Sequence, residues 1–574
     1  MKKIRGLSGA RGQAVGKCVA LKDMIYTVER KEAADSFWEV EKLETARKNY
    51  CKELDHLYKT NVDEIGKDSA GIFLAYKEMA MDDAFFDKCA ARVQREKINI
   101  EYILEEEKKK ITELFCKMKD PYMKERGRDI EYVCDALVRK MLGITTSYEE
   151  ISRIKEKFIL TARDLAPTDT IRLDKTYLRG IVTEKGGQTS HTVILAKTLG
   201  IPAVVGAGHI LEQTAEGDII CIDGGTGEVI VEPDESTLKE YLKLEKRAEE
   251  ENKIYQEIEK QRAETEDGHI ISICVNAGDK EEIEKLDMSV CDGVGLFRTE
   301  FLYMSANRYP SEQMQLHIYK ALAEKAQGKE VIIRTLDIGG DKQIDYMDLP
   351  SETNPFLGYR AIRICLERKD IFKTQLRAIL RASAFGKLSV MFPMIVNMEE
   401  LQAAKRLLEE CKRELKEKGI LYDEGIKTGI MIETPAAVLL SDRLAAEADF
   451  FSIGTNDLIQ YIMAADRMNE KVQNLYRTCN LSVLRAIKTA VQNAHEAGIK
   501  VSMCGEAASD EKMVPVWIGM GIDKLSMVRS QTARIKYIVR HLSKEKAKDV
   551  TARVFELDRI EDIEEYLEEV LRTV

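Results

Sequence analysis

The chain has 574 residues, enough for two or more domains, and a formal net charge of −11. A negative balance of this size argues against a protein that binds nucleic acid. No run of about 18 apolar residues occurs and the N-terminus lacks a long apolar stretch, so we expect neither membrane insertion nor a signal peptide. The twelve cysteines are scattered without a CxxC pair, which is typical of free thiols in a reducing cytoplasm.

The segment from about 33 to 145 predicts a helical bundle. Glycine and proline are sparse there, charges are dense, and apolar residues such as Val40 and Leu43 recur at three-four spacing. The flanking stretches predict strands, so we expect residues 1–32 and 146–232 to form one α/β domain with the bundle as an insertion. The predicted strands are Gln13–Leu21, Lys157–Thr161, Gly180–Thr183, Ala203–Val205, Asp218–Asp223 and Glu228–Val231, and the best helix between them is Ser190–Thr198.

A highly charged segment at 233–262 predicts a long connecting helix with a solvated face. The remainder, 263–574, alternates strand-like segments with charged stretches of helical length, which predicts a (β/α)8 TIM barrel. Active sites of such barrels lie at the carboxyl ends of the strands. The eight predicted strands are Ile270–Val275, Asp292–Phe297, Glu330–Thr335, Leu388–Pro393, Lys427–Glu433, Phe450–Ile453, Lys500–Cys504 and Lys524–Met527.

Polar side chains close or follow several of these barrel strands. The planar guanidinium group of arginine suits phosphate and carboxylate groups. Carboxylates on adjacent strand ends can share one magnesium ion. Such a collection therefore indicates a small anionic substrate and a hard metal ion. The alternatives are a hydrogen-bonded structural carboxylate and a cysteine that serves only the core. The residues concerned are Arg298, Arg334, Glu433, Asn456, Asp457 and Cys504.

The sharpest motif in the first half is Gly-Gly-Gln-Thr-Ser-His-Thr at 186–192. Its two glycines are typical of a turn after a strand, and Thr189 or Ser190 can cap the helix that follows. His191 would then lie in the first helical turn, where unpaired backbone N–H groups favour an anion. That location suits a histidine that carries a phosphoryl group. The alternative is a capping histidine satisfied by a neighbour.

These segments resemble the PEP-utilising enzyme family. The domain order, with a helical bundle inserted before the histidine domain, is similar to the enzyme I members, which are phosphoenolpyruvate–protein phosphotransferases of the sugar phosphotransferase system. The resemblance covers nearly the whole chain. The segments that carry it are 186–192 and 200–206 in the first half, and 293–302, 334–342, 354–360, 451–458 and 503–506 in the barrel.

The resemblance implies that His191 takes the phosphoryl group of phosphoenolpyruvate (PEP) and that pyruvate leaves. Cys504 would protonate the pyruvate enolate, because a thiol with a pKa near about 8.5 is protonated at neutral pH. Mg²⁺ is the implied cofactor, held by Glu433 and Asp457. Thr170 matches a position that contacts the histidine. The implied substrate-binding residues are Arg298, Arg334 and Arg467 on the phosphate side, Arg360 as a further candidate, and Asn456 with Asp457.

The resemblance also implies two protein partners. The helical insertion would dock the histidine-containing carrier protein HPr, and the barrel would form a homodimer. The usual acidic, histidine-bearing stretch of the docking helix is replaced here by Ala70–Met79. An exposed apolar patch rimmed by charge fits a protein partner, although ordinary helix packing is the alternative for each residue. The residues of this expected patch are Ile72, Phe73, Met79 and Met81, beside Asp82 and Asp83.

Two further departures from the family pattern are Ser8–Gly12 and Leu475–Asn480, and we expect neither to touch an assigned catalytic residue. Because the histidine and the barrel site lie in different predicted domains, one domain must swing, and the ends of 233–262 are the expected hinges.

Three functions remain open. The first is phosphoryl transfer to a carrier protein, either by an enzyme I or by a diverged paralogue that uses a different carrier. The second is an ATP-linked relative, which needs a nucleotide-grasp domain that the sequence lacks, and the third is a non-catalytic regulatory or scaffold protein.

Overall fold

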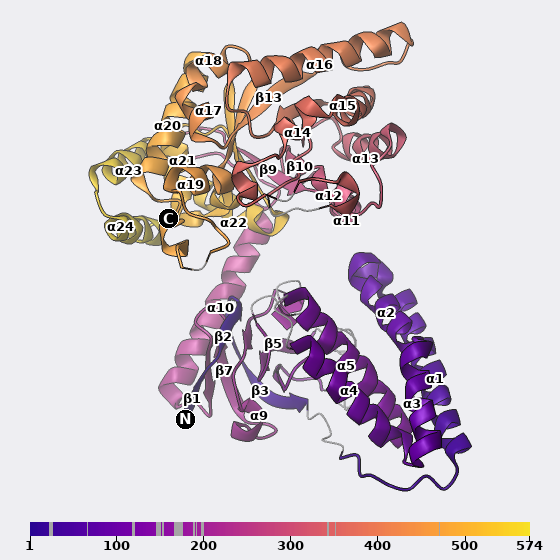
Figure 1. The fold of residues 1–574 in the computed structure, drawn as a ribbon. Coiled ribbons are helices and arrows are strands. Elements are labelled where there is room, and N and C mark those ends of the chain that lie inside the picture. The colour runs from indigo at the N-terminus through magenta and orange to yellow at the C-terminus, as the bar shows by residue number, and fades with distance from the viewer. Residues whose placement is uncertain are drawn as a thin grey trace. The chain divides into compact units, whose positions relative to one another are not determined.

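The computed structural model divides the chain into two compact units, Met1–Glu251 and Asn252–Val574, each with its own buried apolar clusters (Figure 1). Among the described residues, no helix is long and apolar enough to cross a bilayer. The structure describes residues 1–21, 27–65, 67–116, 121–144, 151, 154–165, 176–187, 190, 192–193, 195–196, 200–340, 344–350, 352–469 and 471–574.

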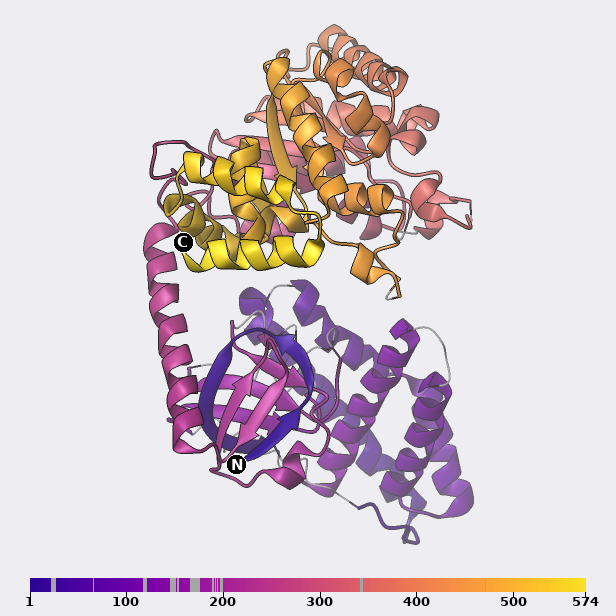
Figure 2. The same cartoon turned by 90° about the vertical axis from the view of Figure 1, so that its left-hand side faces the viewer.

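The first unit contains an eight-stranded mixed sheet with the order β1-β8-β7-β3-β4-β5-β6-β2 (Figure 2). Strands β3 to β6 run parallel to one another, and the remaining pairs are antiparallel. The predicted strands are confirmed to within two residues, and two short N-terminal strands are added. The strands are β1 (Lys2–Arg5), β2 (Leu7–Ala10), β3 (Gln13–Leu21), β4 (Phe158–Ala162), β5 (Leu178–Thr183), β6 (Ala203–Val205), β7 (Ile219–Asp223) and β8 (Glu228–Val231).

A bundle of helices lies between β3 and β4 in the sequence, as the helical periodicity predicts. Helix α1 packs against α2 and α5, and α4 packs against α3 and α5. Leu43, Phe73 and Tyr76 are buried in the core of this bundle, where the hydroxyl of Tyr76 donates to Oδ1 of buried Asp129 at 3.1 Å. The helices are α1 (Ser36–Ile65), α2 (Lys67–Ala80), α3 (Asp83–Glu96), α4 (Ile100–Cys116) and α5 (Pro121–Leu142), and the short α9 (Ile210–Gln213) precedes β7.

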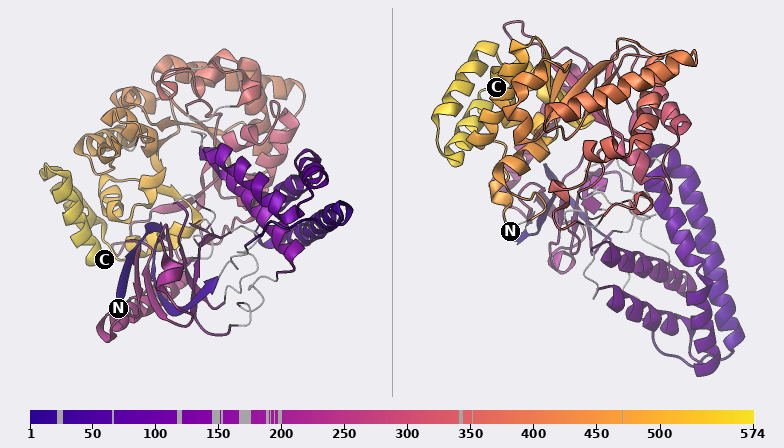
Figure 3. Two further views of the ribbon diagram at one scale, coloured as in Figure 1. Left: turned by 60° about the horizontal axis from the view of Figure 1, so that its bottom comes forward. Right: turned by 45° about the horizontal axis from the view of Figure 1, so that its top comes forward.

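The second unit is a closed barrel of eight parallel strands surrounded by helices (Figure 3). All eight predicted strands are confirmed. The first begins two residues later than predicted, because Ile270 is exposed and bridges Glu264 instead, and ladder pairing starts with Ser272 opposite Lys524. The strands are β9 (Ser272–Ala277), β10 (Gly293–Arg298), β11 (Glu330–Arg334), β12 (Leu388–Phe392), β13 (Lys427–Ile432), β14 (Phe450–Gly454), β15 (Lys500–Cys504) and β16 (Lys524–Met527).

Helices follow the barrel strands and cover them, as the charged stretches of helical length predict. Arg381, which the sequence suggests is a surface or salt-bridge residue, lies on one of them and pairs with Glu312 at 2.7 Å. The helices are α11 (Lys280–Glu284), α12 (Glu300–Met304), α13 (Glu312–Lys325), α14 (Ile362–Glu367), α15 (Lys369–Ser383), α16 (Met398–Glu417), α17 (Pro435–Leu439), α18 (Ser441–Ala445), α19 (Thr455–Met463), α20 (Leu481–Glu496), α21 (Val514–Met520), α22 (Arg529–Arg540), α23 (Lys544–Glu556) and α24 (Ile560–Arg572).

The predicted charged connector forms helix α10 (Glu235–Ile258), and the boundary between the two units falls inside it. Near its start, the hydroxyl of Tyr241 donates to Glu228 of the first unit at 3.4 Å. Beyond its end, the carbonyl of Glu259 accepts from the ammonium of Lys536 in the second unit at 2.6 Å. Its two ends are therefore bonded to different units.

Candidate active site

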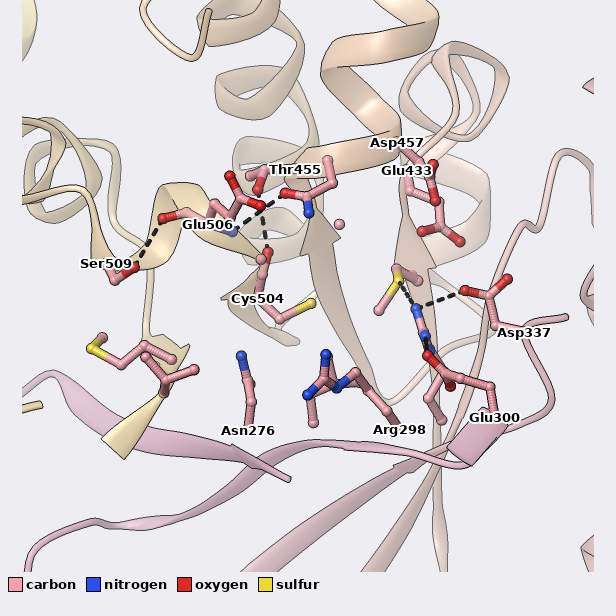
Figure 4. A pocket seen from close by; sticks show the side chains of 18 of the residues that line it. Asn276, Arg298, Glu300, Asp337, Glu433, Thr455, Asp457, Cys504, Glu506 and Ser509 are labelled. Atoms are coloured by element: carbon pink, nitrogen blue, oxygen red, sulfur yellow. Dashed lines mark hydrogen bonds and ion pairs between the residues drawn. The ribbon is translucent and has the colours of Figure 1, made fainter. Parts of the chain in front are cut away.

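A cavity of about 390 Å³ opens at the carboxyl ends of the barrel strands. The strands themselves deliver its side chains: Arg298, Arg334 and Cys504 are the last residues of β10, β11 and β15. Figure 4 shows Arg298 and Cys504 on opposite walls, with Glu433 and Asp457 close together at one side. All eight residues that we predicted for the barrel site line this one cavity: Arg298, Arg334, Arg360, Glu433, Asn456, Asp457, Arg467 and Cys504.

Arg334 and Arg360 are buried and held by carboxylates. Nη2 of Arg334 lies 2.6 Å from Glu300, and its Nη1 lies 2.9 Å from Asp337. Nη2 of Arg360 pairs with Asp337 at 2.9 Å and with Asp457 at 3.2 Å. Charge-assisted bonds of this length hold both guanidinium groups in place before any ligand arrives.

Arg298 and Arg467 each lie against an aromatic ring. The guanidinium of Arg298 lies 5.0 Å from the ring centroid of Phe301, and that of Arg467 lies 5.3 Å from the ring centroid of Phe356. Arg298 also pairs weakly with Glu282, at 4.0 Å. Stacking on a ring leaves the in-plane donors of a guanidinium available for an anion.

Glu433 follows β13 directly and is 1% exposed. Its Oε1 accepts a hydrogen bond from the backbone N–H of Met394 at 2.6 Å. Burial, followed by the charges of Asp457 and Asp337, raises the pKa of Glu433 to about 8. A carboxylate in this position favours a cation beside it.

Cys504 is buried at the end of β15, and its Sγ lies 3.3 Å from the hydroxyl of Ser452 and 3.6 Å from the carbonyl of Ile453. Burial raises the pKa of the Cys504 thiol to about 11. The sulfur therefore carries its proton at neutral pH and can serve as an acid. Because the thiol faces the cavity, its proton is available to a bound ligand.

Asn456 and Asp457 lie in the first turn of α19, which begins directly after β14. Oδ1 of Asn456 accepts from the backbone N–H of Glu506 at 3.3 Å, which ties the ends of β14 and β15 together. The carbonyl of Asn456 accepts from the hydroxyl of Tyr476 at 2.9 Å. Tyr476 belongs to the divergent segment Leu475–Asn480, so this segment braces the backbone of Asn456, which we predicted as a substrate-binding residue.

Family comparisons cover the whole architecture. Residues 252–544 match the PEP-binding domain of PEP-utilising enzymes, residues 154–227 match their mobile domain, and residues 5–126 match their N-terminal domain. The chain belongs to the PEP-utilising enzyme family. Its site thus occupies the domain that, in this family, binds PEP.

Similar proteins in this family match along their whole length. A phosphoenolpyruvate-protein phosphotransferase of Priestia megaterium is 38% identical over 566 residues, 99% of this chain and 98% of that protein. The proteins of the same name from Geobacillus stearothermophilus and Bacillus subtilis are 39% and 37% identical, covering 98% and 100% of this chain and 97% and 100% of their own lengths.

His191 and Thr170 lie outside the described residues. Around the histidine, Gly186 has φ +111°, a conformation that favours glycine, and the N–H of Ser190 donates to the carbonyl of Gly187 at 3.0 Å. This is the turn that the two glycines predict after β5. Thr192 and Val193 are helical, as predicted for the segment that follows.

Three site residues were given no role from the sequence. Glu300 and Asp337 lie two and three residues beyond the predicted arginines, inside the family-like segments, so their place after a barrel strand is a usable signal. Asn276 lies within β9, where Oδ1 accepts from Ser526 at 2.6 Å, and nothing in its sequence context distinguishes it from a structural residue.

Proposed function

We propose that this protein takes the phosphoryl group of PEP onto His191, releases pyruvate and passes the group to the carrier protein HPr. The observation that carries the proposal is one cavity at the carboxyl ends of the barrel strands, which gathers four arginines, five carboxylates, two asparagine amides and a thiol. Full-length similarity to phosphoenolpyruvate-protein phosphotransferases supports it. The chemistry of each group then fits one step of the reaction.

Binding of PEP needs cationic donors for a phosphate and a carboxylate. Arg298 and Arg467 each lie against an aromatic ring and line the same cavity, so both can contact one small anion there. Arg334 is already fixed by two carboxylates, so it loses little freedom when a ligand binds. These three arginines form the proposed phosphate side of the site, with Arg360 and Asn456 beside them.

Glu433 and Asp457 are the residues that would hold Mg²⁺. Magnesium usually takes one or two carboxylates from the protein and completes its shell with substrate oxygens and water. The donor set fits, because both are hard oxygen ligands and the pKa of Glu433 is raised by burial and then by its acidic neighbours. When bound, Mg²⁺ neutralises charge on phosphate and enolate oxygens.

The reaction divides into two bond changes. A ring nitrogen of neutral His191, Nε2 in our proposal, attacks phosphorus while the bond from phosphorus to the enol oxygen breaks. The arginines stabilise the charge that develops on the phosphoryl oxygens. The electron pair of the broken bond leaves pyruvate enolate, whose methylene carbon takes the proton of Cys504. The thiolate that remains recovers a proton from solvent.

The first half-reaction predicts a phosphorylated protein. Purified protein mixed with PEP and Mg²⁺ should gain one phosphoryl group that is acid-labile and base-stable, with pyruvate formed in equal amount, as read by intact mass. The His191→Ala variant should gain none, because it has no acceptor nitrogen. Absence of the group in wild type, despite an intact fold, would contradict the proposal and favour a regulatory or scaffold role.

The proposed docking surface for HPr lies on the helical bundle. An apolar cavity of about 350 Å³ opens there beside Met79, Phe85 and Phe115, with Asp82 and Arg126 also lining it. Of the patch expected from the sequence, Met81 is exposed, whereas Phe73 is fully buried and serves ordinary helix packing. An apolar hollow bordered by charge fits a protein partner. The docking surface that we propose therefore consists of the residues that line this cavity.

Shortening Met79 should weaken this docking. In Met79→Ala we expect the KM for HPr to rise roughly tenfold, since truncating an interface side chain of this kind costs about 1–2 kcal/mol. Phosphorylation of His191 by PEP should keep its wild-type rate. The measurement is steady-state phosphoryl transfer at varied HPr, with Leu142→Ala, an exposed residue that does not line the cavity, as control. An unchanged KM would remove this surface as the docking site and raise the case for a different carrier.

Two further parts of the proposal concern assembly and location. A homodimer through the barrel is supported by the resemblance to enzyme I, and Leu421 and Leu439 of the barrel unit are each 81% exposed. Eleven cysteines among the described residues are free thiols, which supports a cytoplasmic protein. Light scattering coupled to size-exclusion chromatography tests whether the protein is a homodimer.

A further inference from the structure

Asp337 bridges two of the arginines in the cavity. It lies three residues beyond the end of β11 and is 2% exposed. Its Oδ2 lies 2.9 Å from Nη1 of Arg334, and its Oδ1 lies 2.9 Å from Nη2 of Arg360. Each oxygen thus serves a different guanidinium, so one carboxylate fixes the spacing between two cations that would otherwise repel each other.

The backbone conformation at Gly339 allows this bridge to form. Gly339 has φ +107°, and a Cβ at that position would lie 2.5 Å from Cβ of Arg360, so only glycine allows the approach. The N–H of Ala361 donates to the carbonyl of Ile338 at 3.0 Å. The segment that follows β11 is therefore packed directly against the segment that carries Arg360.

Arg360 connects the bridge to the proposed metal ligand. Its Nη1 donates to Oδ1 of Asp457 at 3.4 Å and to the hydroxyl of Tyr461 at 3.2 Å, and its Nη2 contacts Asp457 as well as Asp337. Both terminal nitrogens are thus engaged by the protein. The contacts form one chain of alternating charge: Glu300, Arg334, Asp337, Arg360 and Asp457.

The same arginines retain buried donors that no protein group satisfies. Among the described side chains, the Nε atoms of Arg298, Arg334 and Arg360 are buried without a hydrogen-bond partner. Buried N–H groups are nearly always paired, so these donors indicate an acceptor that arrives with the ligand. Asp337 contacts Arg334 and Arg360 through Nη atoms, and the Nε donors of both arginines are left unpaired.

We propose that Asp337 is a positioning residue of the phosphoryl site, which acts through Arg334 and Arg360 to align their donors for the substrate. The inference rests on the proposed function, since it takes PEP as the ligand. It makes a counter-intuitive prediction. If Asp337 contributed only its negative charge, its removal would strengthen binding of the anion. If it positions the arginines, its removal weakens binding.

The experiment compares PEP binding to two proteins, one with Asp337→Asn and one in which Asp337 is unchanged. Both proteins carry His191→Ala so that no turnover occurs, and titration calorimetry with Mg²⁺ present gives Kd for PEP. We expect Kd to rise by roughly 10- to 100-fold in Asp337→Asn, because a buried charge pair loses one member. Asp558→Asn, an exposed aspartate far along the chain, is the matched control and should keep its Kd. An unchanged or smaller Kd in Asp337→Asn overturns the proposal.

Three further proteins keep the test decisive if Asp337→Asn does not fold. Asp337→Glu keeps the charge but moves the carboxylate by one methylene, so positioning predicts weakened binding, and a wild-type Kd overturns it. Arg334→Lys, alone and with Asp337→Glu, tests whether Asp337 acts through this arginine: the loss in the double variant should be smaller than the sum of the two single losses, and fully additive losses contradict the proposal. If the His191→Ala parent itself binds no PEP, the proposed function fails rather than the role of Asp337.

Discussion

Replacing Cys504 with alanine is expected to slow pyruvate formation by about 10²- to 10⁴-fold, the usual contribution of a positioned general acid. The thiol lies at the end of β15 against Ser452 and faces the cavity, and it is the one thiol among the described residues that line this cavity. The KM for PEP should change by less than about threefold, because an interaction made only in the reaction lowers kcat and leaves substrate binding intact.

The pH dependence follows from the same burial. The pKa of Cys504 is raised to about 11, so the donor form persists through neutral and moderately alkaline pH and is lost only as pH approaches that value. For the protonation step we therefore expect an alkaline limit well above the ordinary cysteine pKa of about 8.5. A limit near the ordinary value would show that the thiol is solvated during turnover.

Stereochemistry distinguishes this role from a packing role. PEP labelled stereospecifically at its methylene carbon, converted in isotopic water, should yield a chiral methyl group in pyruvate, because one fixed thiol serves one face of the enolate. Cys504→Ala should give racemic methyl groups. Cys411→Ala, a buried cysteine on α16 outside the cavity, should retain both rate and chirality. Chiral product from Cys504→Ala would assign the proton to another donor.

Replacing Glu433 with glutamine is the second large effect that we expect. The side-chain oxygen can still accept the N–H of Met394, so the fold should persist, but glutamine cannot ionise beside Asp457 when a cation binds. Metal ions contribute several kcal/mol to such reactions, so His191 phosphorylation should slow by about two to three orders of magnitude at a fixed Mg²⁺ concentration.

The Mg²⁺ dependence of activity and of melting temperature tests whether Glu433 is a metal ligand. The Mg²⁺ concentration that gives half-maximal activity should rise in Glu433→Gln, and the increase in melting temperature produced by Mg²⁺ together with PEP should shrink. Glu399→Gln, an exposed residue in the first turn of α16, should match wild type in both measurements. An unchanged Mg²⁺ dependence in Glu433→Gln would exclude Glu433 as a ligand.

The sequence alone determined the barrel and most of its site. Short apolar runs alternate with charged helical stretches, and parallel strands in a barrel bring their carboxyl ends to one rim. For that reason a residue such as Arg334 or Cys504, once placed at a strand end, could be assigned to the cavity without knowing its neighbours. The two-residue shift of β9 shows the limit of this reasoning, since ladder pairing, not hydrophobicity, decides where a strand starts.

Only the tertiary structure decided which partners these side chains take. The bridge from Asp337 to Arg334 and Arg360 depends on a backbone approach at Gly339, and the bond from Tyr476 to Asn456 joins a divergent loop to the start of α19. Strand periodicity sets the direction of a side chain, but loops have no such period. The contacts they make depend on how distant segments pack, and the orientation of a buried charge depends on those contacts.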